Sequence, residues 1–191
     1  MSKPTEFWLV RHGETEWAKT GQHSGRHDLA LTPRGELEAQ ALRGALSPHE
    51  FSLVLCSPLQ RARKTCEIAG FSSHAQIEPL IMEWDYGDCT SFTQEQLRQK
   101  HPDWNVWTGP IPNGESIEQI AARADEVIEK YRNTGGKVLL FAHGHFLRIF
   151  ASRYLKLPPE TGIALAMDPC AVSIMGWDAG FPAIRQWNRV Y

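Results

Sequence analysis

The sequence predicts a layered α/β fold, and three short apolar runs carry most of that prediction. Each run has the length of a buried strand, and each is followed along the chain by a segment with helical periodicity. Strands and helices that alternate in this way pack as layers around one core. The chain has 191 residues, 42% of them hydrophobic and 22% charged, so we expect a single domain over residues 1–191.

The expected strands follow directly from the apolar runs. Each of the three runs ends abruptly at a histidine, an arginine or a Ser-Pro pair. Two further runs near the C-terminus lie on either side of a turn. The five expected strands are Phe7–Val10, Phe51–Cys56, Val138–Ala142, Ala171–Trp177 and Ala183–Val190.

Helix starts are marked by side chains that can cap free backbone amides. A hydroxyl residue before proline gives two starts, and the capping-box spacing gives two more. These starts are Thr32-Pro33, Ser57-Pro58, Thr93 with Gln96, and Ser116 with Gln119. In the first of these helices, the residues expected on one apolar face are Leu37, Ala41, Leu42 and Ala45.

Residues 80–115 differ in composition from the rest of the chain. They are rich in Trp, Tyr, Gly, Pro and Asp, and only Thr93–Lys100 has a helical pattern. We interpret this segment as an aromatic-rich insertion over the edge of the sheet. Trp104 and Trp107 would form either a hydrophobic plug or a platform for a sugar, and the sequence leaves both open.

Charge and cysteine content limit the partners and the compartment. Twenty basic and 22 acidic residues give a net charge of −2, so we expect no nucleic acid and no membrane as partner. Met1 to Glu6 lacks the pattern of a signal peptide, and no apolar run would span a bilayer. The four cysteines form no CxxC pair, so we expect reduced thiols in a cytoplasmic protein, with only Cys89 as a candidate for exposure.

Residues suited to phosphate binding follow three of the expected strands. They are Arg11 and His12, then Arg61 one turn into a helix, then His143 and His145. Ligands in open α/β sheets sit at the carboxyl ends of strands, so these side chains converge if the strands are parallel neighbours. The helix start near Ser57 would add backbone amides. Any one of these residues alone is usually structural, but together they predict a site for a phosphate dianion.

The full set of motifs resembles a known family. It comprises Leu9–Trp17 (LVRHGETEW), Ser57–Thr65 (SPLQRARKT), Glu83–Gly87 (EWDYG), Asn113–Ser116 (NGES) and Phe141–Arg148 (FAHGHFLR). In this order the motifs resemble those of the histidine phosphatase superfamily, the phosphoglycerate mutase-like enzymes, along nearly the whole chain. The resemblance implies a three-layer α/β/α sandwich around a mostly parallel sheet, and neither a metal nor an organic cofactor.

The resemblance also implies roles for individual residues. His12 corresponds to the nucleophile that becomes phosphorylated, and Glu83 corresponds to the general acid. His143 corresponds to a residue that holds phosphoryl oxygens during catalysis. The implied set of substrate-binding and phosphate-binding residues is Arg11, Ser24, Arg61, Gly144 and His145.

The chemistry is reasonable for these residue types without the family. A neutral imidazole is a good nucleophile near pH 7, and its second nitrogen would donate to a backbone carbonyl in the loop at Gly13. A protonated carboxyl can then supply the proton that the departing oxygen needs. Glu14 and Glu16 are rivals for this role because they are close to His12 in sequence. We favour Glu83 because its neighbours Trp84 and Tyr86 would favour the protonated form of a carboxyl.

Two departures from the mutase pattern indicate the branch. His145 and Ala18 stand where the mutases usually have Asn. The motifs look most like the sugar-bisphosphatase branch, which includes sedoheptulose-1,7-bisphosphatase. We therefore expect a phosphatase of small phosphorylated metabolites such as sugar phosphates and bisphosphates. The alternatives are a mutase and an inactive module that binds phosphorylated ligands, although the complete set of five motif residues argues against the latter.

Overall fold

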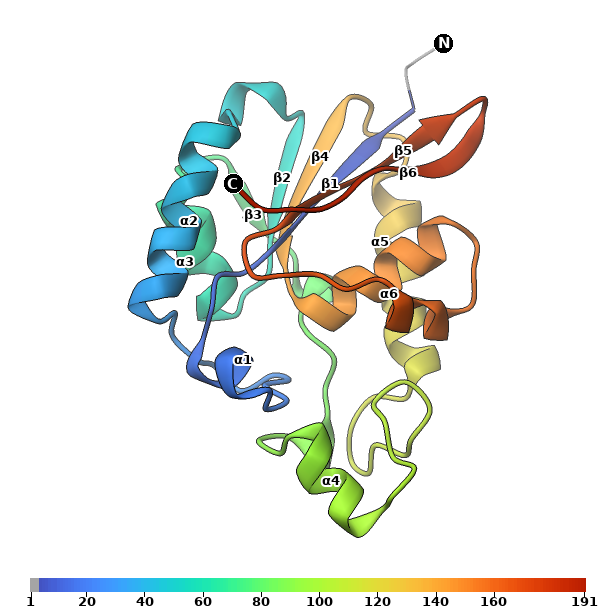
Figure 1. Cartoon of the computed structure of the whole chain (residues 1–191). Coiled ribbons are helices and arrows are strands. Elements are labelled where there is room, and N and C mark those ends of the chain that lie inside the picture. Colours follow the sequence, from blue (N-terminus) through green and yellow to red (C-terminus); the bar gives the residue numbers. More distant parts are fainter. Residues whose placement is uncertain (1–3) are drawn as a thin grey trace.

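The computed structural model describes residues 4–191 and shows a six-stranded sheet between two layers of helices (Figure 1). The strand order is β3-β2-β4-β1-β5-β6. The pairs β2–β3, β2–β4 and β1–β4 are parallel, whereas β5 and β6 pair antiparallel at one edge. The predicted three-layer sandwich with a mostly parallel sheet is confirmed. The strands are β1 (Glu6–Arg11), β2 (Leu53–Cys56), β3 (Ala75–Ile77), β4 (Lys137–Ala142), β5 (Val172–Asp178) and β6 (Phe181–Arg189).

Each strand contributes to two cores because successive side chains point to opposite faces of the sheet. In β4, Val138 and Leu140 pack with the helices α5 and α6, while Leu139 and Phe141 pack with α2 and α3. Figure 1 shows these two helix pairs on opposite sides of the sheet. The helices are α1 (Glu16–Thr20), α2 (Pro33–Ala45), α3 (Gln60–Ile68), α4 (Gln94–Lys100), α5 (Ile117–Tyr131) and α6 (Gly144–Tyr154).

Three of the four predicted helix starts are capped as expected. The Thr32 hydroxyl accepts from the amide of Gly35 at 3.0 Å, and both capping boxes are present. The start at Ser57-Pro58 is wrong, because α3 begins only at Gln60 and its N-cap residue, Leu59, has no side-chain cap. The Gln60 amide instead donates to Asp28 at 2.7 Å, so a neighbouring loop caps this helix.

Two predictions about burial are corrected. Leu37 is 64% exposed, because α2 buries the face formed by Gly35, Ala39 and Leu42. Spacings of four and three residues put that second set on one face, which is the one turned to the sheet. Cys89 is 5% exposed and packs in the core beside the aromatic residues of the insertion. All four cysteines are buried free thiols.

The aromatic-rich insertion lies beyond the carboxyl ends of the central strands, in the lower part of Figure 1. Trp104 and Trp107 are 4% and 5% exposed and belong to the α5–α6 core, which favours the plug over the sugar platform. A bridge between Gln22 and Thr93 joins the insertion to the loop after α1. The sequence pattern missed α1 and β3, which are too short to produce a clear periodicity.

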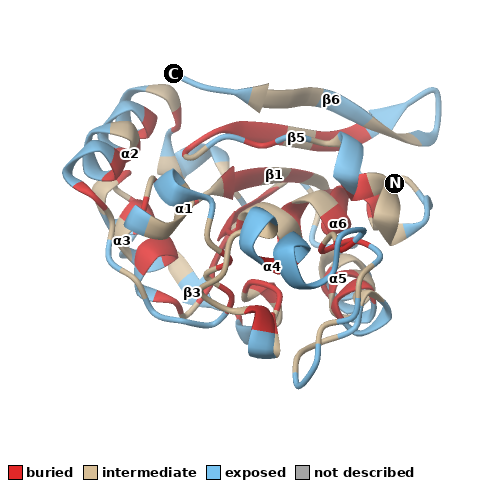
Figure 2. Cartoon of the chain, turned by 60° about the horizontal axis from the view of Figure 1, so that its bottom comes forward, coloured by how far each residue is buried: buried red, intermediate tan, exposed pale blue. Residues whose placement is uncertain are grey.

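The carboxyl end of the sheet is therefore covered by short elements and loops. Figure 2 looks at this end, where buried strand β1 lies behind the more exposed turns of α1 and α4. Residues 1–3, which carry part of the prediction against a signal peptide, lie outside the described residues. Over residues 4–191, each helix is too short or too polar to cross a membrane.

Candidate active site

Parallel pairing brings the three motif-bearing strand ends together. Strands β2, β4 and β1 are neighbours, so the residues after them meet at one edge of the sheet. A cavity of about 170 Å³ opens there. The predicted residues that line it are Arg11, His12, Ser24, Arg61, Glu83, Gly144 and His145. The remaining predicted residue, His143, is fully buried with its ring centre 5.2 Å from that of His12.

His12 is held in one orientation and in its neutral form. It is 5% exposed, and its Nδ1 lies 2.7 Å from the carbonyl oxygen of Gly13, which fixes the proton on Nδ1. The hydrogen bond predicted from the sequence is therefore present. Burial, together with the charges of Arg61 and Arg11, keeps the pKa of His12 well below 6.5. Its Nε2 lone pair faces the Arg61 Nε–H, at 3.2 Å.

Arg61 is a fully buried cation held by backbone oxygens. Its Nη1 donates to the His27 carbonyl and its Nη2 to the Gly25 carbonyl, both at 2.8 Å. Within residues 4–191 no carboxylate forms an ion pair with it. Burial lowers the pKa of Arg61, but a guanidinium remains charged in proteins. This leaves a positive charge beside His12 that an anionic ligand would neutralise.

Arg11 supplies a second such cation. Its Nη1 donates to the Met167 carbonyl, while its Nε is buried without a hydrogen-bond partner in the described chain. Gly144 lies against this side chain, and a Cβ there would be 3.3 Å from Arg11 Nε. A larger residue at position 144 would therefore crowd the guanidinium.

His143 is oriented by the residue that was expected to cap α3. The Ser57 hydroxyl lies 2.7 Å from His143 Nε2, and the buried Nδ1 has no partner among the described residues. Burial, the charge of Arg61 and proximity to His12 hold the pKa of His143 well below 6.5. A neutral ring that accepts from Ser57 at Nε2 presents an Nδ1–H donor. His143 does not itself line the cavity, but its ring lies beside that of His12, which does.

Glu83 is 6% exposed, and its carboxylate lies against the N-terminus of α6. Its Oε1 accepts from the amides of Trp84 at 3.0 Å and Phe146 at 2.9 Å, and its Oε2 accepts from the His145 amide at 3.3 Å. Backbone donors that the sequence did not predict therefore bind the carboxylate, and its sequence neighbours Trp84 and Tyr86 are buried. A carboxylate has about four lone-pair positions, so one remains on Oε2 for a proton.

The rival carboxylates lie elsewhere. Glu14 Oε1 accepts from the Thr32 hydroxyl at 2.8 Å, and its Oε2 is 3.9 Å from Arg34. Glu16 is exposed on the first turn of α1. Neither residue lines the 170 Å³ cavity that contains Arg61 and Glu83. Proximity in sequence to His12 is a poor guide here, because the side chains of Glu14 and Glu16 point away from the cavity although Trp17 and Ala18 line it.

Several residues of the site were not predicted. The Tyr86 hydroxyl lies 2.6 Å from His145 Nδ1, and His23 donates from Nδ1 to the Phe92 carbonyl at 2.7 Å. Arg148 donates to the Gly162 carbonyl at 2.9 Å and lies 4.6 Å above the Trp107 ring. Tyr86 belongs to the motif Glu83–Gly87 and Arg148 to the motif Phe141–Arg148, so their place in these motifs could have identified them. His23 lies on a loop, where no periodicity or spacing marks it.

The rest of the cavity wall is polar, and it includes the cation Arg148. Burial lowers the pKa of both His145 and His23, so both rings are neutral at pH 7. A second cavity, of about 420 Å³, shares the lining residues Gly21, His23, His145 and Arg148 with the first. No three or more His, Cys, Asp or Glu side chains of the described chain are grouped to hold a metal ion.

Comparison with known proteins gives similarities along the chain. A family model described as histidine phosphatase superfamily (branch 1) matches residues 7–190. The acid phosphatase of Mycobacterium tuberculosis is 36% identical over 176 residues, which are 90% of this chain and 86% of that protein. Sedoheptulose 1,7-bisphosphatase of Saccharomyces cerevisiae is 34% identical over 183 residues, which are 78% of this chain and 67% of that protein.

A solved structure agrees with the fold. The open reading frame Rv3214 of Mycobacterium tuberculosis superposes with a TM-score of 0.91 at 33% identity. The superposition covers 97% of this chain and 98% of that one. The similarity therefore includes the three strand ends, the insertion and the antiparallel edge.

Proposed function

The chain belongs to branch 1 of the histidine phosphatase superfamily, and from this premise we propose that it hydrolyses small phosphorylated metabolites through a phosphohistidine on His12. One observation carries the proposal. The hydrogen bond from His12 Nδ1–H to the Gly13 carbonyl, at 2.7 Å, leaves Nε2 as the nucleophilic lone pair in the cavity. Arg61 donates toward that lone pair, which marks where a phosphoryl group would meet both residues.

In the first step, His12 Nε2 forms a bond to phosphorus. The bond from phosphorus to the leaving oxygen breaks, and that oxygen keeps the electron pair and takes the proton from Glu83. Arg11 and Arg61 stabilise the charge on the equatorial oxygens, and His143 Nδ1–H adds a third donor. The dianionic phosphoryl group and two uncompensated guanidiniums match in charge.

In the second step, water attacks the phosphorus of the phosphohistidine. Glu83, now a carboxylate, takes a proton from that water, and the bond between phosphorus and Nε2 breaks. Inorganic phosphate leaves, and His12 is again a neutral ring with its proton on Nδ1. Because Oε2 of Glu83 accepts only the long bond from the His145 amide, at 3.3 Å, we assign the transferred proton to Oε2.

We propose sugar phosphates and bisphosphates as the substrate class. The part of the cavity shared with the 420 Å³ cavity offers the rings of His23 and His145, with Tyr86 and Gln22 in the adjoining wall. These groups suit the hydroxyls of a sugar. Arg148 would suit a second anionic group. The relative named sedoheptulose 1,7-bisphosphatase supports this choice.

We also propose that the protein works in the cytoplasm. All four cysteines are buried free thiols, and none is paired in a disulfide. Thiols persist in reducing compartments, where disulfides are rare.

A product assay separates hydrolysis from mutase activity, which would use the same phosphohistidine. We expect a panel of sugar phosphates to release inorganic phosphate. In a parallel assay, 3-phosphoglycerate with a trace of 2,3-bisphosphoglycerate should yield no 2-phosphoglycerate. Rapid formation of 2-phosphoglycerate, with little phosphate released from any sugar bisphosphate, would contradict the proposal.

A further inference from the structure

Glu83 lies on a segment that has no regular secondary structure of its own. It falls between two short 3₁₀ helices, Pro79–Ile81 and Gly87–Cys89. Backbone carbonyls in such a segment need donors from elsewhere, since no helix or sheet ladder supplies them. The position of an acid on this segment therefore depends on the side chains that hold its backbone.

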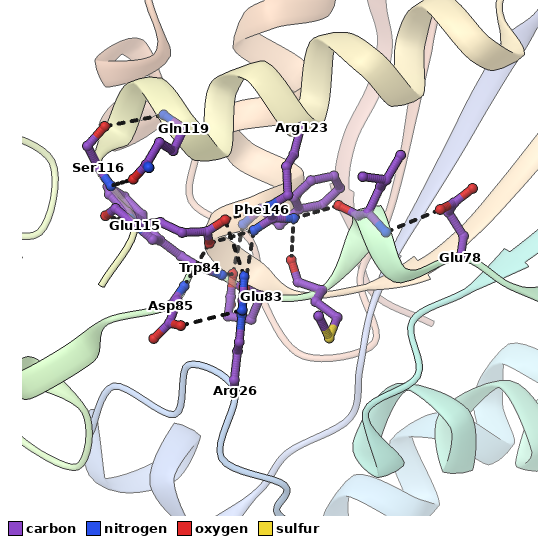
Figure 3. Close-up of polar contacts among 12 residues, drawn as sticks. Arg26, Glu78, Glu83, Trp84, Asp85, Glu115, Ser116, Gln119, Arg123 and Phe146 are labelled. Carbon is purple, nitrogen blue, oxygen red and sulfur yellow. Dashed lines mark hydrogen bonds and ion pairs between the residues drawn. The ribbon is translucent and has the colours of Figure 1, made fainter. Parts of the chain in front are cut away.

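Arg123 is the main source of those donors. It projects from α5 toward the segment, as Figure 3 shows, and its side chain is 15% exposed. Its Nη1 donates to the carbonyls of Leu80 at 2.5 Å and Met82 at 3.0 Å. Its Nη2 lies 3.4 Å from the carbonyl of Glu83 itself. One guanidinium thus contacts two carbonyls that precede the Glu83 side chain and the carbonyl of Glu83 itself.

Glu115 holds the other side of the same segment. Its carboxylate accepts from Arg123 Nε at 2.7 Å and from Nη2 at 2.8 Å, which is a two-point ion pair. Its Oε2 also accepts from the Asp85 amide at 3.0 Å. Its backbone carbonyl accepts from the Trp84 indole at 2.8 Å. The pair therefore fixes the chain both before and after Glu83.

Arg123 also touches the partner that binds the Glu83 carboxylate. Its guanidinium lies over the Phe146 ring, 5.3 Å from the ring centre. The amide of Phe146 donates to Glu83 Oε1 at 2.9 Å. The same side chain therefore contacts the backbone of the acid and the residue that orients its carboxyl group (Figure 3).

We infer that Arg123, locked by Glu115, is a positioning residue for the general acid Glu83. The inference rests on the proposed function, because it concerns how that reaction protonates its leaving group. The ion pair with Glu115 compensates the charge of Arg123. In this respect Arg123 differs from Arg11 and Arg61, which have no carboxylate partner among the described residues. Its contribution is geometric: it keeps Glu83 Oε2 at the distance from the leaving oxygen that proton transfer requires.

Arg26 provides a matched control. Its Nη2 lies 3.3 Å from Glu115 Oε1 and its Nη1 lies 3.5 Å from Asp85 Oδ2, so it belongs to the same ion network. Its side chain is 42% exposed, however, and it has no hydrogen bond to the backbone of residues 80–83. Exposed ion pairs of this kind contribute little. Arg26→Met should leave catalysis nearly unchanged.

The test compares leaving groups. For p-nitrophenyl phosphate the departing phenolate is stable without a proton, whereas an alkyl phosphate such as glycerol 3-phosphate needs the acid. The quantity to measure is kcat/KM, which reports only the steps through transfer to His12. We expect Arg123→Met to lower kcat/KM by ~10–100-fold for the alkyl phosphate and less than ~3-fold for the aryl phosphate. Arg123→Lys should restore part of the loss, and Glu115→Gln should show the same selectivity.

Combination with Glu83→Gln completes the test. Once the acid is gone, adding Arg123→Met should cause no further selective loss, because its effect acts through Glu83. Circular dichroism of each variant checks the fold. If Arg123→Met does not fold, the comparison of leaving groups is made with Arg123→Lys and Glu115→Gln instead.

Three results would overturn the inference, and the first two would do so in distinguishable ways. A selective loss in Glu83→Gln, with equal losses on both substrates in folded Arg123 and Glu115 variants, would overturn the positioning role alone. A Glu83→Gln variant without any selectivity would overturn the assignment of the acid and the positioning role together. An Arg26→Met variant that matches Arg123→Met would also contradict the inference.

Discussion

The two sides of the cavity are built in different ways. On the phosphate side, His12, Arg11, Arg61 and His143 come from the ends of neighbouring strands or the helix beside them, and their partners are mostly backbone oxygens. On the leaving-group side, Glu83 and Tyr86 come from irregular segments held by side chains. Under the proposed function, the sheet therefore positions the side chains that transfer the phosphoryl group, while the loops position the residues that contact the leaving group.

Charge differs between the sides as well. The phosphate side presents two guanidiniums without carboxylate partners in the described structure. On the leaving-group side, Arg123 is compensated by Glu115 and the rings of His23 and His145 are neutral, while Arg148 donates to backbone carbonyls and forms no ion pair among the described residues. Under the proposed function, the first side would bind the dianionic phosphoryl group, and the second would bind the substrate's hydroxyls and, at Arg148, a second anionic group. Mutations on the two sides should consequently differ in their dependence on substrate.

The largest expected effect is that of His12→Ala. Removing the nucleophile should lower kcat by more than ~10³-fold with every substrate, because no other side chain can form the intermediate. The variant should keep its fold, which thermal unfolding can check. Substantial turnover by a folded His12→Ala variant, in an assay of phosphate release, would place the reaction on another residue.

The next effect in size is that of Glu83→Gln, and it should depend on substrate. We expect kcat/KM to fall ~10²–10⁴-fold for sugar phosphates but only slightly for p-nitrophenyl phosphate. Glutamine keeps the size of the side chain and an acceptor for the backbone amides. Equal losses on both substrates would argue for a structural role of Glu83. They would also contradict the expectation that mutations on the leaving-group side depend on the substrate.

A smaller effect, independent of the leaving group, is expected for Arg61→Lys. Lysine keeps the charge but loses the planar fork that binds the carbonyls of Gly25 and His27 while facing His12. We expect kcat/KM to fall ~10²–10³-fold on sugar and aryl phosphates alike. Near-normal kinetics would mean that Arg61 does not contact the transferred group.

The smallest expected effect is on stability against pH. The pKa values of His12, His143 and His145 in the folded protein lie well below 6.5. In the unfolded chain these rings bind protons below about pH 6.5, so acid favours unfolding, and their contribution to stability is fully present only above that pH. Each ring should contribute a slope of at most ~1.4 kcal/mol per pH unit in this range.

Urea unfolding at pH 7.5, 6.5 and 5.5 measures this slope. His143→Asn should flatten it, and His49→Asn, at an exposed position, is the control. Stability that is constant between pH 7.5 and 5.5 would show that these rings titrate alike in both states.

The same division explains how far the sequence could predict the site. Arg11, His12 and His143 directly follow apolar runs, so strand periodicity places them at one sheet edge as soon as the strands are parallel. The tautomer of His12 could be predicted because its acceptor, the Gly13 carbonyl, belongs to the next residue in the chain. These positions depend on local pattern and on a general rule of sheet topology.

The leaving-group side could be predicted only in part. Glu83 was found through its motif, but two of its three backbone donors come from α6, far along the chain, so its polar surroundings were missed. The cap of α3 was misassigned because Ser57 bonds to His143, a contact that sequence spacing does not show. Contacts between distant segments that lack periodicity leave no local signal.

The central claim is that the phosphoryl group is transferred from the substrate to His12. Trapping the phosphorylated enzyme tests this claim most directly. The enzyme is mixed with ³²P-labelled substrate, quenched in alkali and digested, and the labelled peptide is sequenced. We predict label that is stable to base and labile to acid, confined to the peptide containing His12 and absent in His12→Ala. Label on any other residue, or turnover without labelled protein in rapid-quench samples, would contradict the account.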